Sequence, residues 1–258
     1  MRVVVCYKWV IDEADITVEE SNRTLNFKNV KYKISEYDRN ALELGAALHE
    51  AHGWELLAVT VGQGVEASVK DVLSRGPEKA YYVDDPALED ADSAVTAKVL
   101  AKVIEKIGNV DLVICGEGSS DGYSQQVGPR LAALLGYKAL TYVSGLEVEG
   151  DSLKAQRKLD DGVEVVRVTG PAVITVTPDI NKPRIPSLKQ ILAAKKKPAE
   201  PLALGDLGDN LTALAGFEVA GVSASVVERK QVRINDQGMD LKEAAAKLVK
   251  QLREEKVI

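Results

Sequence analysis

The sequence predicts an α/β fold, a mostly parallel sheet with helices on both faces, followed by a C-terminal arm and helix. Short continuous apolar runs recur along the chain. Such runs are typical of strands that are covered on both faces of a sheet. Between them lie segments whose apolar residues recur at helical spacing. Alternating strands and helices are the pattern of a parallel sheet with crossover helices.

The first elements follow directly from the N-terminus. Residues 2–7 (RVVVCY) form an apolar run that predicts a buried strand. Residues 11–33 are polar and irregular, which predicts a hairpin or loop excursion. A helix begins at Ser35, which we expect to cap it. Asp38 stands three residues later, in a position that resembles a capping box.

The middle of the chain alternates between the two kinds of element. A break at Arg75-Gly76-Pro77 ends one helix. The predicted strands are 55–61, 80–83, 111–115, 139–148 and 172–176, the predicted helices are 65–73, 93–107 and 126–135, and a hairpin pattern covers 152–168.

The C-terminal third divides into two parts. Residues 179–197, here called the recognition loop, hold Arg184 between two prolines and end in three lysines. This pattern fits a helix with a cationic end, or a docking loop with an apolar anchor and steering charges. We expect an α/β domain over 1–195 and a linker with a terminal helix over 196–258. The helix, 240–256, has an apolar stripe that its own domain or a partner must cover.

Composition excludes several classes of protein. The chain has 258 residues, a formal net charge of −6, 45% hydrophobic and 28% charged residues. This is an ordinary globular mixture, too apolar for global disorder. The acidic balance and the 5% aromatic content disfavour nucleic acid as a partner. With only two cysteines, Cys6 and Cys115, a disulfide scaffold is excluded. Because His49 and His52 are far from both cysteines in the sequence, we expect no metal site.

The sequence also bears on location. It shows no run of the roughly 18 apolar residues that a membrane span needs. It opens directly into a strand pattern, without the apolar region and cleavage site of a signal peptide. We therefore expect a cytoplasmic protein without a membrane span.

The segment from Asp111 to Pro129 is the strongest candidate for a binding site. Its pattern predicts a buried strand, a small polar loop and a helix. Ligands of open α/β sheets bind beyond the carboxyl ends of the strands, which is where this loop would lie. Glycines permit close approach of a ligand, and the helix start offers N–H groups to phosphate. A plain turn would use similar residues, and neither common phosphate motif is present. We favour nucleotide binding.

A second candidate is the start of the predicted helix 93–107. Ser93 and Thr96 there can cap the helix or bind an anion, and spacing alone favours the cap. No catalytic set is evident, because a G-x-S-x-G elbow and a Cys–His pair are both missing from the sequence. Redox chemistry would therefore need an organic cofactor.

Several segments together resemble the β subunit of electron-transferring flavoproteins, including the FixA branch. The similarity covers nearly the whole chain. The segments are Val5-Cys6-Tyr7-Lys8 with Asp12, Ser35-Glu36-Tyr37-Asp38 before Ala41-Leu42-Glu43, Leu73-Ser74-Arg75-Gly76-Pro77, the loop Gly116–Gly128, and Asn181-Lys-Pro-Arg184 with the trailing lysines.

The resemblance implies a Rossmann-like adenine-nucleotide-binding fold and an obligate heterodimer with an α subunit, on which the terminal helix would pack. Such proteins carry electrons from acyl-CoA dehydrogenase-type flavoenzymes through an FAD that the α subunit mostly holds. Acceptors are quinone, ferredoxin or flavodoxin partners. The β subunit buries a second nucleotide, which is AMP in the conventional type and FAD in the electron-bifurcating type.

The resemblance also implies roles for individual positions. Leu188 matches the apolar anchor that inserts into a partner dehydrogenase. The residues that match nucleotide contacts are Cys6, Ser35, Glu36, Tyr37, Asp38, Val61, Gly62, Gly116, Glu117, Gly118, Ser119, Ser120, Asp121, Gly122, Tyr123, Ser124, Gln125, Gln126 and Val127.

The choice between AMP and a second FAD depends on two short segments. Residues 91–96 resemble the Ala-Asp-Thr-x-x-Thr of bifurcating members, and residues 126–129 resemble their loop. This favours FAD, with Ser93 and Thr96 as ligands and NADH as an electron donor. A conventional subunit with AMP is the alternative. Two further alternatives do not involve electron transfer by this chain. One is an adenine-nucleotide-binding enzyme or regulatory module, and the other is a structural subunit with an empty site.

Overall fold

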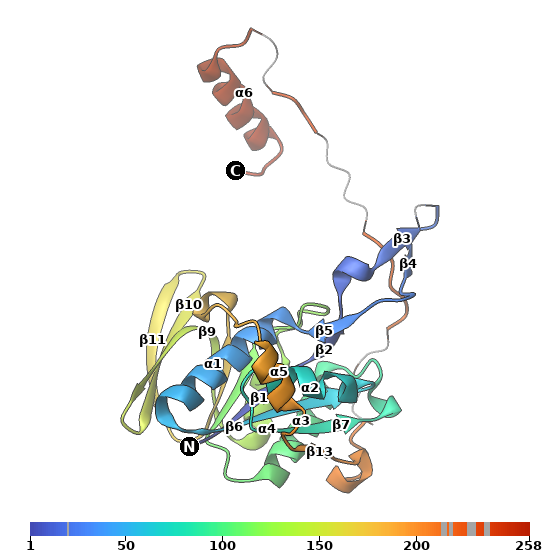
Figure 1. Ribbon diagram of the computed structural model, residues 1–258. Coiled ribbons are helices and arrows are strands. Elements are labelled where there is room, and N and C mark those ends of the chain that lie inside the picture. The colour runs from blue at the N-terminus through green and yellow to red at the C-terminus, as the bar shows by residue number, and fades with distance from the viewer. Residues whose placement is uncertain (20, 213–215, 217–218, 226–230, 235–237) are drawn as a thin grey trace. The chain divides into compact units, whose positions relative to one another are not determined.

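The computed structural model describes residues 1–19, 21–212, 216, 219–225, 231–234 and 238–258 (Figure 1). The chain forms two compact units. One comprises Met1–Thr17 and Leu25–Val222, and the other comprises Val18–Thr24 and Ser223–Ile258. No helix of the described residues has the length and apolar character needed to cross a membrane.

The first unit contains a nine-stranded sheet of order β11-β10-β9-β12-β8-β1-β6-β7-β13. All neighbouring strands from β9 to β13 in this order pair in parallel, and only β10 pairs antiparallel, with β9 and β11. The bounds are β1 Arg2–Cys6, β6 Glu55–Gly62, β7 Lys79–Asp84, β8 Leu112–Gly116, β9 Lys138–Glu149, β10 Ser152–Leu159, β11 Gly162–Thr169, β12 Ala172–Val176 and β13 Ala199–Pro201. The predicted α/β class is confirmed.

Helices cover both faces of this sheet, as Figure 1 shows. One apolar core joins the sheet to α1, α2 and α5, and a second core joins its other face to α3 and α4. The central strands are apolar on both sides because both faces are covered, and β8 is buried at every position. The helices are α1 Glu36–His52, α2 Val69–Ser74, α3 Ser93–Ile107, α4 Val127–Leu135 and α5 Leu188–Ala194.

The polar excursion near the N-terminus forms short strands, as predicted. β2 Trp9–Ile11 pairs antiparallel with β5 Tyr32–Ile34, and β3 Thr17–Glu19 forms a two-stranded sheet with β4 Thr24–Asn26. Single turns of 3₁₀ helix complete the unit: η1 Glu13–Asp15, η2 Val65–Ser68, η3 Pro86–Leu88, η4 Pro178–Ile180 and η5 Leu204–Leu207.

The segment after residue 195 differs from the expected linker. β13 extends the sheet by pairing in parallel with β7, and three leucines that follow it, Leu202, Leu207 and Leu211, are buried in the second core. Apolar burial of these side chains holds the segment on the sheet. The first compact unit accordingly continues to Val222.

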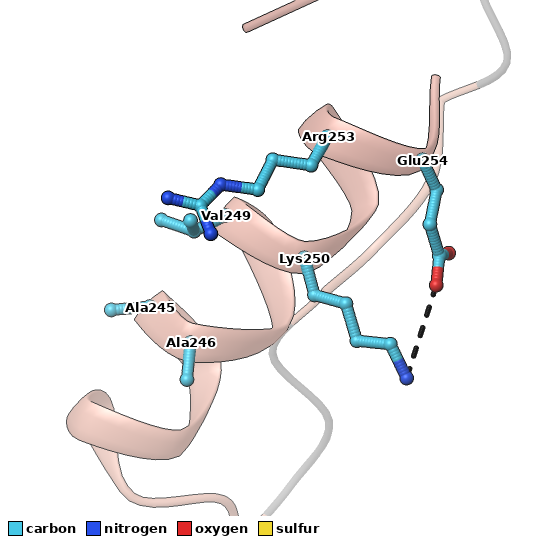
Figure 2. A pocket seen from close by; sticks show the side chains of 6 residues that line it. All are labelled: Ala245, Ala246, Val249, Lys250, Arg253 and Glu254. Carbon is cyan, nitrogen blue, oxygen red and sulfur yellow. Dashed lines mark ion pairs between the residues drawn. The ribbon is translucent and has the colours of Figure 1, made fainter. Parts of the chain in front are cut away.

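The second unit contains the predicted terminal helix, α6 Leu241–Glu254. None of its residues, all of which the structure describes, is buried. Figure 2 shows Ala245, Ala246 and Val249 on this helix, where their short side chains leave a shallow hollow. Lys250 and Glu254 form an ion pair at its rim, with 3.8 Å between Nζ and Oε1.

Candidate functional site

The order of the strands reverses next to β1. From β1 the chain passes to β6 and β7 on one side, and it later returns to β8 on the other side. Ligands of open α/β sheets bind beyond the carboxyl ends of the strands at such a switch point. Cys6 ends β1 and Gly116 ends β8, so the topology brings these two predicted residues to the edge of the sheet at which such folds bind ligands, here called the crevice.

A buried carboxylate joins the strand ends at this place. The Asp38 side chain is 6% exposed, and it accepts hydrogen bonds from the amides of Lys8 (2.8 Å) and Gly116 (3.1 Å). Burial raises the pKa of Asp38 to about 7, against the lowering effect of these two bonds. Asp38 therefore joins the ends of β1 and β8 to α1, and the capping-box role expected for it is wrong.

The cap expected of Ser35 is also wrong. Ser35 stands at the N-cap position of α1, but its side chain makes no capping bond. Its Oγ instead accepts from the amide of Ser120 at 3.2 Å, while its own amide donates to the carbonyl of Lys8 at 3.0 Å. The side chain thus ties the loop after β8 to the start of α1.

Side chains from the end of β1 and from α1 also contact this loop. Lys8 Nζ lies 2.6 Å from Asp121 Oδ2. The rings of Tyr37 and Tyr123 are 5.1 Å apart at 38°, within the range of favourable aromatic pairs. Tyr123 Oη donates to Glu117 Oε1 at 3.0 Å. These contacts bring together predicted site residues from α1 and from the loop.

The loop backbone is tight and strained. A Cβ on Gly116 would lie 2.7 Å from Asp38 Oδ1, and one on Gly118 would lie 2.5 Å from Tyr123 Cδ2. Glycine is thus required there by space. Tyr123 and Gln125 adopt positive φ angles of 42° and 57°, which is costly for residues with a Cβ. Such strain is concentrated at functional sites.

The far end of the loop leads into α4. Ser93 Oγ donates to Gln126 Oε1 at 3.1 Å, and the Arg130 guanidinium donates to the same oxygen at 2.8 and 3.1 Å. Spacing alone favoured Ser93 as the cap of α3, and the resemblance made it a ligand. The cap is Asp92, which accepts from the amides of Ala94 and Val95, each at 2.8 Å. The Ser93 hydroxyl is therefore not used in capping and can bond the loop or a ligand.

Two helix starts face this region, and they differ in charge. The first turn of α4 contains no acidic residue, and Arg130 lies within it. At α3 the carboxylate of Asp92 already occupies two amides. A phosphate would therefore be favoured at α4 over α3. Within the described residues the buried Ser120 Oγ has no hydrogen-bond partner, so this loop retains a polar atom for a ligand.

Four more predicted residues, Val61, Gly62, Cys6 and Leu188, lie outside this loop. Val61 and Gly62 end β6, beside β1. Cys6 is buried, and a hydrogen bond with Cys115 together with burial raises the pKa of its thiol. A buried neutral thiol is unreactive, so Cys6 could contact a ligand without taking part in covalent chemistry. Leu188 lies on α5 and is 71% exposed.

Sequence reasoning missed the roles of three residues. Lys8 binds Asp38 through its amide and Asp121 through its ammonium group. Asp92 caps α3, and Arg130 fixes Gln126. An Asp directly before a helical run is a recognisable cap signal, so the role of Asp92 was accessible. The contacts of Lys8 depend on how distant segments meet in the fold.

In the part of the chain that the structure describes, His, Cys, Asp and Glu side chains form no group of three or more that could hold a metal ion. A family model described as the electron transfer flavoprotein domain matches residues 24–207. This match contains the crevice from Ser35 to Val127 and the recognition loop.

Proposed function

Since the chain belongs to the electron transfer flavoprotein domain family, we propose that it is the β-type subunit of a heterodimeric electron carrier. It binds a second nucleotide at the switch point between β1 and β8, while an α subunit holds the main FAD. The observation that supports this most is the loop 117–126. Ser35 ties it to the start of α1 through Ser120, Asp38 holds Gly116 just before it, and the loop leads into α4, which has no side-chain cap.

The crevice fits a nucleotide phosphate. The α4 start is free of acidic side chains, the loop backbone is glycine-rich, and the hydroxyl of Ser120 is unpaired among the described residues. Residues 117–127 would hold the phosphates through backbone amides, with Arg130 adding positive charge. A bound flavin would supply one- and two-electron chemistry. The protein residues bind and orient it and exclude water.

We favour FAD as the second nucleotide. Because Asp92 caps α3, the Ser93 hydroxyl has no capping duty, and it already lies 3.1 Å from Gln126 in the loop. Ser93 and Thr96 can then contact the part of a dinucleotide that extends beyond the phosphate at α4. With a second FAD, the heterodimer would accept electrons from NADH and divide them between a dehydrogenase or quinone and a ferredoxin or flavodoxin.

AMP is the alternative, and one observation favours it. The Asp92 carboxylate lies at the start of α3, where it occupies the amides of Ala94 and Val95. A second phosphate placed there would meet this negative charge. AMP has a single phosphate, which α4 alone can accommodate.

Two surfaces of the chain would contact other proteins. Leu188 on the recognition loop would enter an apolar pocket of an acyl-CoA dehydrogenase-type partner, since 71% of its surface is exposed. The apolar stripe of α6, which includes Leu241, Leu248 and Leu252, would pack on the α subunit. An amphipathic helix without a buried residue needs such a cover.

The test is the nucleotide content of the complex. The chain is coexpressed with its α partner, the heterodimer is denatured, and released FAD and AMP are quantified. About two FAD and no AMP per heterodimer would support the FAD form. About one FAD and one AMP would support the AMP form. Failure to form a heterodimer, or a content of ATP alone, would contradict the proposal in favour of a separate nucleotide-binding module.

A further inference from the structure

We propose that Arg184 is a positioning residue that fixes the recognition loop on α1, so that Leu188 meets a dehydrogenase in one set orientation. The inference rests on the docking role in the proposed function. It assigns a task to Arg184, whose side chain lies away from the nucleotide crevice and binds α1 instead.

Arg184 binds two carboxylates of α1. Its Nε and Nη2 donate to the two oxygens of Glu43 at 2.8 and 2.9 Å, and its backbone amide donates to Glu43 Oε2 at 3.0 Å. Nη1 and Nη2 also donate to Glu50, the latter at 3.1 Å. Glu43 and Glu50 lie two turns apart on the same side of α1. A planar guanidinium can bind Glu43 through two parallel N–H bonds and still donate to Glu50, whereas an ammonium group lacks this fork geometry.

An amide pair reinforces this contact where the recognition loop begins. Asn40 Nδ2 donates to the carbonyl and to Oδ1 of Asn181 at 2.9 and 3.1 Å, and Asn181 Nδ2 donates to the carbonyl of Asn40 at 3.0 Å. Asn40 is 6% exposed. The first residues of the loop are therefore held along α1 by side chains that are partly shielded from water.

The end of the recognition loop is held separately. Lys197 Nζ donates to the carbonyls of Leu73, Gly76 and Pro77 at 2.9, 3.2 and 2.7 Å. Ala194 is buried in the first core at 2% exposure. These contacts lie at the C-terminal end of α2 and beyond it, where a cation is favourable.

Between these two attachments the loop presents apolar side chains to solvent. Ile185 is 92% exposed and Leu188 is 71% exposed. A capping box between Ser187 and Gln190 starts α5 and so sets the direction in which Leu188 points. The loop is attached at both ends and exposes apolar residues between them. It is therefore preorganised as an anchor for a partner protein.

Preorganisation predicts a particular kinetic result. Without the Arg184 contacts, the loop must be ordered when the partner binds, and that cost weakens affinity. Once docked, the distance between the redox centres is restored. Loss of Arg184 should therefore raise KM for the heterodimer and leave kcat nearly unchanged. A residue that served only stability would affect neither parameter in the folded protein.

The first experiment needs no dehydrogenase. Amide hydrogen exchange is measured on the purified heterodimer, as wild type and as the variants R184Q, R184K and K196Q. R184Q should raise exchange in residues 185–194 by about 10-fold or more while β1 and β8 stay protected. K196Q removes one positive charge from an exposed position of the same loop and should exchange like wild type. Unchanged exchange in R184Q would overturn the proposal.

The second experiment measures docking. Butyryl-CoA and a short-chain acyl-CoA dehydrogenase serve as the electron source, and reduction of the heterodimer is followed in about 0.15 M salt, where surface charges are screened. R184Q should raise KM about 5- to 20-fold at constant kcat. R184K keeps the charge but not the paired geometry, so it should recover only part of the wild-type value.

The anchor variant L188A separates this inference from the proposed docking role. If L188A raises KM and R184Q does not, the docking role stands and the positioning role of Arg184 is refuted. If neither variant changes KM, the docking role itself fails, and the exchange data alone decide whether Arg184 holds the loop. Equal KM values for R184K and wild type would show that Arg184 acts through its charge.

Discussion

The carboxylate of Asp38, in the first turn of α1, accepts a hydrogen bond from the amide of Gly116, the last residue of β8, at 3.1 Å. The same carboxylate accepts from the amide of Lys8 just after β1. One buried group thus joins the three segments that border the proposed nucleotide site. Its protonation and the absence of a side chain at Gly116 are both open to test.

Replacing Asp38 with Asn should change how stability depends on pH. The pKa of Asp38 lies at about 7 in the fold and at about 3.9 in an unfolded chain. Between these values the folded protein binds more protons, so its stability falls as pH rises. Asn cannot accept both amide bonds with one oxygen and should cost about 1–3 kcal/mol at pH 5. The gap in Tm between wild type and variant should narrow towards pH 8, and a constant gap would contradict this.

Replacing Gly116 with Ala should damage the crevice. The added Cβ would lie 2.7 Å from Asp38 Oδ1 and 2.9 Å from the carbonyl carbon of Tyr37. Neither neighbour can move freely, so we expect a loss of about 1–3 kcal/mol and of bound nucleotide. Gly205→Ala is the matched control, because its Cβ would meet nothing within 4 Å. Comparable Tm losses in both variants would argue against a special role for Gly116.

Capping and ligand binding at α3 can be separated by two substitutions. Asp92→Ala removes the cap and should destabilise the protein by about 1 kcal/mol. Ser93→Ala leaves the cap intact and should keep stability within about 0.5 kcal/mol. If Ser93 contacts a second FAD, its loss, alone or with Thr96→Ala, should lower flavin content. Released flavin and Tm are both measured, and an equal Tm loss for Ser93→Ala and Asp92→Ala would contradict the assignment of the cap.

Deleting residues 240–258 should abolish pairing with the α subunit, because the apolar stripe of α6 has no cover of its own among the described residues. Leu248→Glu should weaken pairing strongly by placing a charge in the stripe. Glu243→Gln on the polar side is the control and should pair normally. Copurification of the coexpressed subunits gives the readout. A truncated chain that still copurifies would show that other surfaces carry the heterodimer.

The sequence predicted the strands and helices of the first unit well, because each has a strong local pattern. The helix predicted over 93–107 has those same bounds, and the apolar runs became the central strands. The later edge strand β13 was missed. It is short and contains Pro201, and it forms only because β7 offers a free edge.

The crevice was predictable in position but not in its internal contacts. The glycine-rich loop after a buried strand marked the place. The partners of Ser35 and Asp38 could not be inferred, because local capping and long-range bonding compete for the same oxygens. Ser35 binds Ser120, and Asp38 binds Gly116, only when β8 lies beside β1 in the folded sheet.

The position of β1 in the sheet has a consequence for biosynthesis. β1 is synthesised before both of its neighbours in the sheet, which are Glu55–Val59 on one side and Leu112–Ile114 on the other. Until β8 has emerged, one edge of this apolar strand has no partner in the sheet. Unpaired strand edges promote aggregation. The segments that Asp38 joins are thus complete only after β8 has been synthesised, and until then one edge of β1 stays open to pairing with other chains.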